Sequence, residues 1–129
     1  MPKILVIEDD RFLQKALEEK FQKEGFEVEQ AFDGKEGIIK AVKQQPHFIL
    51  LDLMMPVMDG TTALRHLKDM PETKDIPVAI LTVVPNGVPK STNDQEIFNL
   101  AVGFWEKDKS SITKIVKNVK EFLKNIESK

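Results

Sequence analysis

The sequence predicts a doubly wound α/β domain, in which helices cover both faces of a parallel sheet. Short aliphatic runs alternate with amphipathic stretches along the chain, as expected when each parallel strand is joined to the next by a helical crossover. Three of the aliphatic runs also end in an acid or a hydroxyl, namely Glu8, Asp52 and Thr82. Ligands of doubly wound sheets bind at the carboxyl ends of the strands, so this edge is the expected functional site.

Composition limits the function classes. The chain has 129 residues and a formal net charge of −2, and it contains no cysteine. This length fits one domain, which we place at residues 1–129. The lack of cysteine excludes disulfides and thiolate metal sites, and the two isolated histidines are not spaced like a zinc site, so a metal would need oxygen ligands. The slight negative charge argues against direct nucleic-acid binding. No membrane span or signal peptide is recognisable, so we expect a cytoplasmic location without membrane contact.

The first half of the chain predicts three strands and two helices. Ile4–Ile7 is a continuous apolar run, and Phe48–Asp52 is another that closes on a carboxylate; both are typical of strands buried on both faces, whereas Phe26–Ala31 alternates as a near-edge strand does. The first helix is expected to begin at an Asp10 N-cap and to end at Gly25. We expect its apolar face to contain Phe12, Leu13, Ala16, Leu17 and Phe21. The second helix is expected after Asp33-Gly34, with Ile38, Ile39 and Val42 on its apolar face.

The second half predicts two more strands and three more helices. A helix with apolar residues Ala63, Leu64 and Leu67 is followed by a strand at Val78–Thr82. Prolines break regular structure between residues 83 and 93, so the next helix is expected to be short, beginning at Asn93 or Asp94 and including Leu100. The last strand is placed at Gly103–Lys107, and the last helix begins at Ser110 or Ser111.

Residues from four strand ends are expected to meet. They are Glu8 and Asp9 after the first strand, Asp52 after the third, Thr82 after the fourth and Lys107 at the fifth. Carboxylates held close together repel one another, so such a cluster is stable mainly when a cation compensates its charge. Oxygen ligands beside a nucleophile favour Mg²⁺. Phosphoryl transfer is the chemistry that this combination predicts.

Two motifs resemble those of the response-regulator receiver domains of two-component signalling. Ile4–Asp10 looks like the acidic-pocket motif of that family, and Leu50–Gly60 looks like its phosphoacceptor motif almost letter for letter. The resemblance implies that Asp52 is the phosphoacceptor and that Thr82 and Lys107 complete the catalytic set. It also implies a Mg²⁺ site formed by Glu8, Asp9, Asp52 and the carbonyl of Met54.

The same resemblance implies a fold and a switch. The fold is flavodoxin-like, with strand order 2-1-3-4-5. Phosphorylation is expected to draw Thr82 toward the phosphoryl group and Phe104 into the space that Thr82 leaves, which changes a protein-binding surface. The partners would be a sensor histidine kinase or phosphotransfer protein and a downstream effector protein, with homodimer formation through the face of helix 4, strand 5 and helix 5. The chain would not be a turnover enzyme, because it only catalyses its own phosphorylation and dephosphorylation.

Departures from the family pattern keep one alternative open. Asp108 stands where the family usually has proline, and the segment between Thr82 and Lys107 is longer and richer in proline. A phosphorylation-independent adaptor with the receiver fold is therefore the alternative function. A haloacid-dehalogenase-like phosphohydrolase would need a second Asp where Met54 stands, and a flavodoxin-like electron carrier would need a phosphate-cradling loop in place of Glu8–Asp10.

Overall fold

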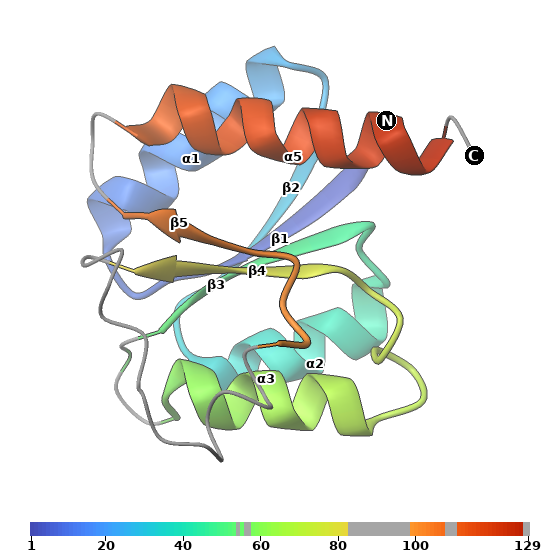
Figure 1. Ribbon diagram of the computed structural model, residues 1–129. Coiled ribbons are helices and arrows are strands. Elements are labelled where there is room, and N and C mark those ends of the chain that lie inside the picture. The colour runs from blue at the N-terminus through green and yellow to red at the C-terminus, as the bar shows by residue number, and fades with distance from the viewer. Residues whose placement is uncertain (54, 56–57, 83–98, 108–110, 128–129) are drawn as a thin grey trace.

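The computed structural model describes residues 1–53, 55, 58–82, 99–107 and 111–127. They form a five-stranded parallel sheet in the order β2-β1-β3-β4-β5 (Figure 1). The strands are β1 (Lys3–Ile7), β2 (Glu27–Ala31), β3 (Phe48–Asp52), β4 (Val78–Thr82) and β5 (Gly103–Glu106). The helices are α1 (Arg11–Lys23), α2 (Gly34–Gln44), α3 (Gly60–Asp69) and α5 (Ile112–Glu127). The predicted fold class and strand order are confirmed.

Two boundaries near the C-terminus differ from those predicted. Five helices were expected, and the described residues contain four. The remaining one, the fourth in chain order, was predicted to begin at Asn93 or Asp94 and falls mainly on residues 83–98, which lie outside the described ranges. Its predicted inclusion of Leu100 is wrong, because Asn99 and Leu100 lie in a turn. Strand β5 ends at Glu106, so Lys107 lies just beyond the strand rather than in it.

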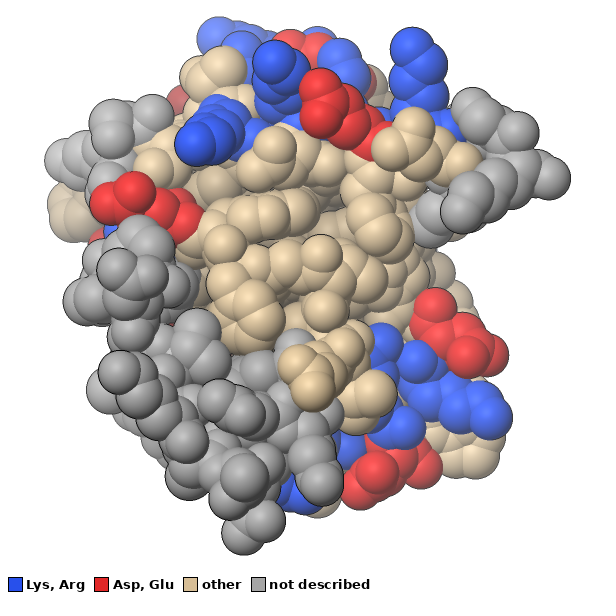
Figure 2. Space-filling view, in the orientation of Figure 1, with Lys and Arg blue, Asp and Glu red and all other residues tan. Residues whose placement is uncertain are grey.

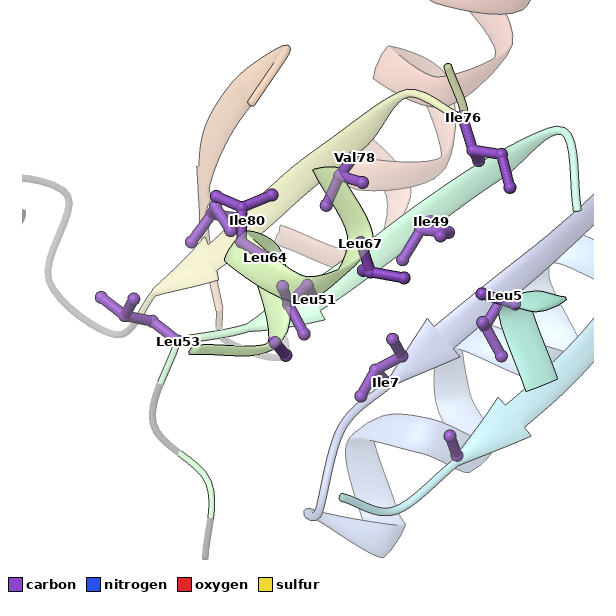
Figure 3. Packing of buried hydrophobic residues seen from close by; sticks show 13 residues of the cluster. Leu5, Ile7, Ile49, Leu51, Leu53, Leu64, Leu67, Ile76, Val78 and Ile80 are labelled. Atoms are coloured by element: carbon purple, nitrogen blue, oxygen red, sulfur yellow. The ribbon is translucent and has the colours of Figure 1, made fainter. Parts of the chain in front are cut away.

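The sheet separates two apolar clusters. Figure 1 shows α1 and α5 on one face of the sheet and α2 and α3 on the other. Leu5 and Ile7 of β1 pack toward α2 and α3, while Ile4 and Val6 pack toward α1 and α5, and all four are completely buried. Figure 3 shows the first cluster, where Leu64 and Leu67 of α3 lie over β3 and β4. Because both faces of β1 and β3 are covered, Ile4–Ile7 and Phe48–Leu51 are apolar at every position.

Capping residues fix where the helices begin. Asp10 caps α1 by accepting hydrogen bonds from the amides of Phe12 and Leu13, and Gly25 follows the helix with φ of 89°, which suits glycine. Asp33 caps α2 by accepting a 2.8 Å hydrogen bond from the Glu36 amide. None of the helices in the described residues is long and apolar enough to cross a membrane.

The Asp33 cap gives a first testable prediction. Asp33→Ala should lower the free energy of unfolding by about 1 kcal/mol, because the Glu36 amide at the helix start loses its acceptor. Urea unfolding followed by circular dichroism measures this. Asp69→Ala is the matched control, since Asp69 is an exposed last residue of α3 and caps nothing there. Equal stability of the two variants would contradict the assignment of Asp33 as a cap.

One prediction for the packing of α1 is wrong. Phe12 was assigned to the apolar face, but its side chain is 81% exposed, whereas Gln14 is 1% exposed. Leu13, Leu17 and Phe21 are buried as predicted. The polar Gln14 is therefore buried in the core, whereas the apolar Phe12, which hydrophobicity places there, is exposed.

The two aromatic residues of β5 point to opposite faces of the sheet. Trp105 stacks on Phe48, with ring centroids 6.0 Å apart and planes 9° from parallel, on the side of α1 and α5. Phe104 packs against the cluster on the α2 and α3 side. Adjacent residues of a strand point to opposite faces of a sheet, so Trp105 packs under α1 and α5 while Phe104 lies on the other side.

Candidate functional site

Three carboxylates converge at the carboxyl edge of the sheet. Because β1 and β3 are parallel neighbours, Asp52 at the end of β3 lies beside Glu8 and Asp9, which follow β1. Each of the three offers an oxygen atom, and these oxygens all lie within 4.8 Å of one another. Glu8 and Asp52 are 0% and 1% exposed, whereas Asp9 is exposed. The site thus consists of two buried acids, Glu8 and Asp52, and one exposed acid, Asp9.

Lys107 brings a positive charge to this pair. Its Nζ atom donates a 2.8 Å hydrogen bond to Asp52 Oδ2 and lies 3.0 Å from Glu8 Oε1. The position of Lys107 follows from the sheet, because β5 is paired in parallel with β4, which is paired with β3. One ammonium therefore faces three carboxylates, and charge compensation is incomplete without a further cation.

The electrostatics reflect this imbalance. Burial raises the pKa of Glu8 to about 8, and the negative charge of Asp52 adds to the increase, although the hydrogen bond from the Asp10 amide and the nearby Lys107 ammonium oppose it. Burial would lower the pKa of Lys107, but its hydrogen bond to Asp52 and its ion pair with Glu8 outweigh this and raise it. Burial would raise the pKa of Asp9, but interactions with the side chains of Glu8 and Asp52 and the positive charge of Lys107 outweigh this and lower it.

The donor set fits a small divalent cation. All of the side-chain ligands are carboxylate oxygens, which hard cations such as Mg²⁺ prefer. Glu8 Oε1 is buried and has no hydrogen bond of acceptable geometry, despite its short distance to the Lys107 ammonium. A buried carboxylate oxygen without a hydrogen bond is costly, and a cation at the cluster would satisfy it.

Backbone contacts hold the acids in place. The Glu8 amide donates to the Ala31 carbonyl at 2.9 Å, and the Asp10 amide donates to Glu8 Oε2 at 2.9 Å. On the other side, the Gly60 amide donates to the Leu53 carbonyl at 2.9 Å. A Cβ atom on Gly60 would come within 2.5 Å of the Asp52 carbonyl oxygen and 2.6 Å of the Leu53 Cα. Only glycine lets α3 approach the backbone of the Asp52 segment this closely.

This contact gives a second prediction. Gly60→Ala should lower the free energy of unfolding by about 1 to 3 kcal/mol, because rigid backbone atoms must move to admit the methyl group. Urea unfolding measures the loss. The control is Thr62→Ala, which truncates an exposed side chain in the same helical turn and should leave stability near that of the wild type. A Gly60→Ala protein as stable as this control would show that the contact is easily relieved.

The structure brings together four of the residues singled out in the sequence: Glu8, Asp9, Asp52 and Lys107. Thr82 ends β4 opposite Glu106, but its side chain is not among the described ones. Met54 and Asp108 lie outside the described residues altogether.

Sequence reasoning missed Gln14 and Gly60. Gln14 belongs to no recognisable motif. It lies three residues before Leu17 and seven before Phe21, however, and this spacing places it on the buried face of α1. Gly60 was recognised only as part of the phosphoacceptor motif, and its close approach to the Asp52 backbone is a long-range contact that local sequence does not reveal.

Comparison with known proteins identifies the family. The family model described as "Response regulator receiver domain" matches residues 4–93. The DNA-binding dual master transcriptional regulator RpaA of Synechocystis is 42% identical over 84 residues, which is 65% of this chain and 35% of RpaA. Response regulator PleD of Caulobacter vibrioides is 44% identical over 82 residues, which is 64% of this chain and 18% of PleD. The matches therefore span about a third or less of these two relatives.

A solved structure agrees over nearly the whole chain. The receiver domain of the Francisella response regulator 1452 superposes with a TM-score of 0.79 and 28% sequence identity, covering 98% of this chain and 99% of that domain. The family model thus covers more than half of the chain and includes both acidic motifs, and the fold comparison extends to its remainder. The chain belongs to the response regulator receiver domain family.

Proposed function

We propose that this chain is a phosphorylation-activated receiver of a two-component phosphorelay, accepting a phosphoryl group on Asp52 from a histidine kinase or phosphotransfer protein. The observation that carries the proposal is the arrangement of buried Asp52 between the Lys107 ammonium, 2.8 Å away, and the acids Glu8 and Asp9. This arrangement supplies a nucleophile, a positive charge beside it and ligands for a cation. We take residues 1–129 as one receiver domain.

In the proposed mechanism an oxygen of Asp52 attacks the phosphorus of a phosphohistidine. The bond from phosphorus to the donor imidazole breaks, and the imidazole leaves with its bonding electron pair. Lys107 would neutralise charge that develops on the phosphoryl oxygens. Glu8, Asp9 and Asp52 would hold Mg²⁺, with the carbonyl of Met54 as a further proposed ligand. Bound Mg²⁺ would supply the remaining positive charge. Water later hydrolyses the acyl phosphate, so the chain is reset rather than turning over a substrate.

The proposed output is a change of the surface around β5. Thr82 would hydrogen-bond a phosphoryl oxygen, and Phe104, which is partly exposed at the α2 and α3 side, would move inward. In Figure 2, which has the orientation of Figure 1, the middle of the surface around β5 shows no charged side chains. Leu100 and Val102, which precede β5, are 49% and 41% exposed.

Exposed apolar side chains such as those of Leu100 and Val102, beside an uncharged surface (Figure 2), support protein binding. The proposed partners at this face are a downstream effector protein or a second copy of the chain, paired through helix 4, β5 and α5, where helix 4 is an expectation for residues outside the described ranges. A cytoplasmic location is part of the proposal, because histidine kinases present their phosphoryl groups there.

Chemical trapping of the acyl phosphate tests the proposed acceptor. The protein is incubated with acetyl phosphate and Mg²⁺ and then treated with borohydride, which reduces an aspartyl phosphate to homoserine. Peptide mass spectrometry should place this change at Asp52 and leave Asp9 and Asp59 unchanged. Reduction at another acid would contradict the proposed site, and no reduction at any acid would favour the phosphorylation-independent adaptor.

A further inference from the structure

Gln14 of α1 is a buried polar residue with an unusual set of contacts. Its side chain is 1% exposed, and the two N–H groups of its Nε2 atom are shared among three backbone carbonyls within hydrogen-bond distance. The distances are 2.8 Å to Val6, 3.1 Å to Glu8 and 2.8 Å to Ala31. These carbonyls belong to the end of β1, the residue after it, and the end of β2. One carboxamide therefore joins two strand ends to the loop that carries the acids.

The contacts of Gln14 fix the backbone from which Glu8 projects. The Ala31 carbonyl that accepts from Gln14 also accepts from the Glu8 amide, at 2.9 Å. Gln14 thus holds the Glu8 carbonyl directly and the acceptor of the Glu8 amide as well. The Glu8 carboxylate is in turn bonded to the Asp10 amide at 2.9 Å. The peptide units around Glu8 and Asp9 consequently have little freedom to turn.

The choice of glutamine here is not explained by packing. Gln14 Oε1 is buried and has no hydrogen-bond partner among the described atoms, which is a cost that an apolar side chain of similar size would avoid. Its neighbours Leu13, Leu17 and Phe21 form the apolar face that such a side chain would join. The amide donors of Gln14 must therefore serve a purpose beyond filling space.

We propose that Gln14 is a positioning residue for the cation site: by clamping the carbonyls of Val6, Glu8 and Ala31, it holds Glu8 and Asp9 in the geometry that binds Mg²⁺. The inference rests on the proposed function. Groups behind the ligands of a metal commonly set its affinity by orienting those ligands, and their removal weakens binding about 10- to 100-fold. Gln14 touches neither the cation nor the phosphoryl group and acts only through the backbone of the acidic loop.

Nuclear magnetic resonance of the wild-type protein tests the coupling without any substitution. Titration with Mg²⁺ should shift the side-chain amide signals of Gln14, because the Glu8 carbonyl to which they are bonded adjusts when the acids take up the cation. Gln45 is an internal control, since its Nε2 also donates to three carbonyls, those of Ala41, Val42 and Glu72, at the opposite end of the sheet. Gln14 signals that move no more than those of Gln45 would overturn the proposal.

A second experiment measures the effect on affinity. Calorimetric titration of Gln14→Met with Mg²⁺ should give a Kd at least about tenfold weaker than that of the wild type. Gln45→Met, the same substitution far from the site, should keep the wild-type Kd. Thr73→Val should do so too, because it removes a buried 2.6 Å hydrogen bond to the Leu67 carbonyl and so lowers stability away from the site.

The outcomes separate this inference from the function on which it rests. Mg²⁺ binding by Gln14→Met as tight as by Thr73→Val would overturn the positioning role while leaving the phosphoacceptor proposal intact. A wild-type protein that binds no Mg²⁺ would overturn both. Where Gln14→Met does not fold, the wild-type resonance experiment decides the question.

Discussion

Lys107→Met is expected to slow phosphorylation of Asp52 by acetyl phosphate about 100-fold or more. The Lys107 Nζ atom is 2.8 Å from Asp52 Oδ2, so it is placed to neutralise charge that develops on the phosphoryl group. Loss of one such preorganised donor typically costs a factor of about 100 to 1000 in rate. The rate is measured by intact mass spectrometry over time at saturating Mg²⁺.

A second readout distinguishes this effect from misfolding. Lys107 and a cation share the same acids, so removal of the ammonium should leave Mg²⁺ affinity unchanged or increase it, while the rate falls. Lys68→Met is the matched control, because Lys68 is also partly buried and donates a 2.8 Å hydrogen bond to the Ile76 carbonyl, away from the acids. A wild-type rate in Lys107→Met would remove Lys107 from the catalytic set.

Glu8→Gln is expected to stabilise the metal-free protein at pH 8 by a few kcal/mol and to weaken Mg²⁺ binding at the same time. Burial raises the pKa of Glu8 to about 8, above its ordinary value of 4.5. Between these two values the folded protein holds a proton that the unfolded chain releases, so stability is full below pH 4.5 and is lost as the pH rises toward 8. Glutamine cannot ionise and removes this part of the pH dependence.

Urea unfolding at several pH values between 5 and 8, with and without Mg²⁺, checks this prediction. Mg²⁺ should restore the stability of the wild type at pH 8 more than that of Glu8→Gln, because the cation favours the ionised carboxylate. Glu24→Gln is the control. Glu24 pairs with Lys120 at the surface, and this pairing lowers the pKa of Glu24, so its ionisation affects the free energy of unfolding only below this pH range. Parallel pH profiles for wild type and Glu8→Gln would contradict the assigned ionisation.

The sequence predicted the sheet and the acidic site well because both depend on local patterns. The continuous apolar runs at Ile4–Ile7 and Phe48–Leu51 mark strands buried on both faces, and a parallel sheet necessarily brings their carboxyl ends to one edge. The convergence of Glu8, Asp9 and Asp52 follows from those two facts, and the structure bears it out.

The features that the sequence did not reveal depend on three-dimensional contacts. Phe12 has the right spacing for a core position, yet it lies in the first turn of α1 and its side chain is 81% exposed. Gln14 is polar but buried, because backbone carbonyls of β1 and β2 offer it acceptors that hydrophobicity patterns ignore. Leu100 follows a proline-rich segment and lies in a turn instead of the predicted helix.

The most direct test of the central claim is the intact mass of the protein after incubation with acetyl phosphate, with and without Mg²⁺, for wild type and Asp52→Asn. The account predicts a gain of one phosphoryl group that requires Mg²⁺ and is absent in Asp52→Asn, because asparagine lacks the nucleophilic carboxylate. A wild-type protein that binds Mg²⁺ but never gains a phosphoryl group, even when dephosphorylation is too slow to hide it, would contradict the account and leave the chain as a phosphorylation-independent adaptor.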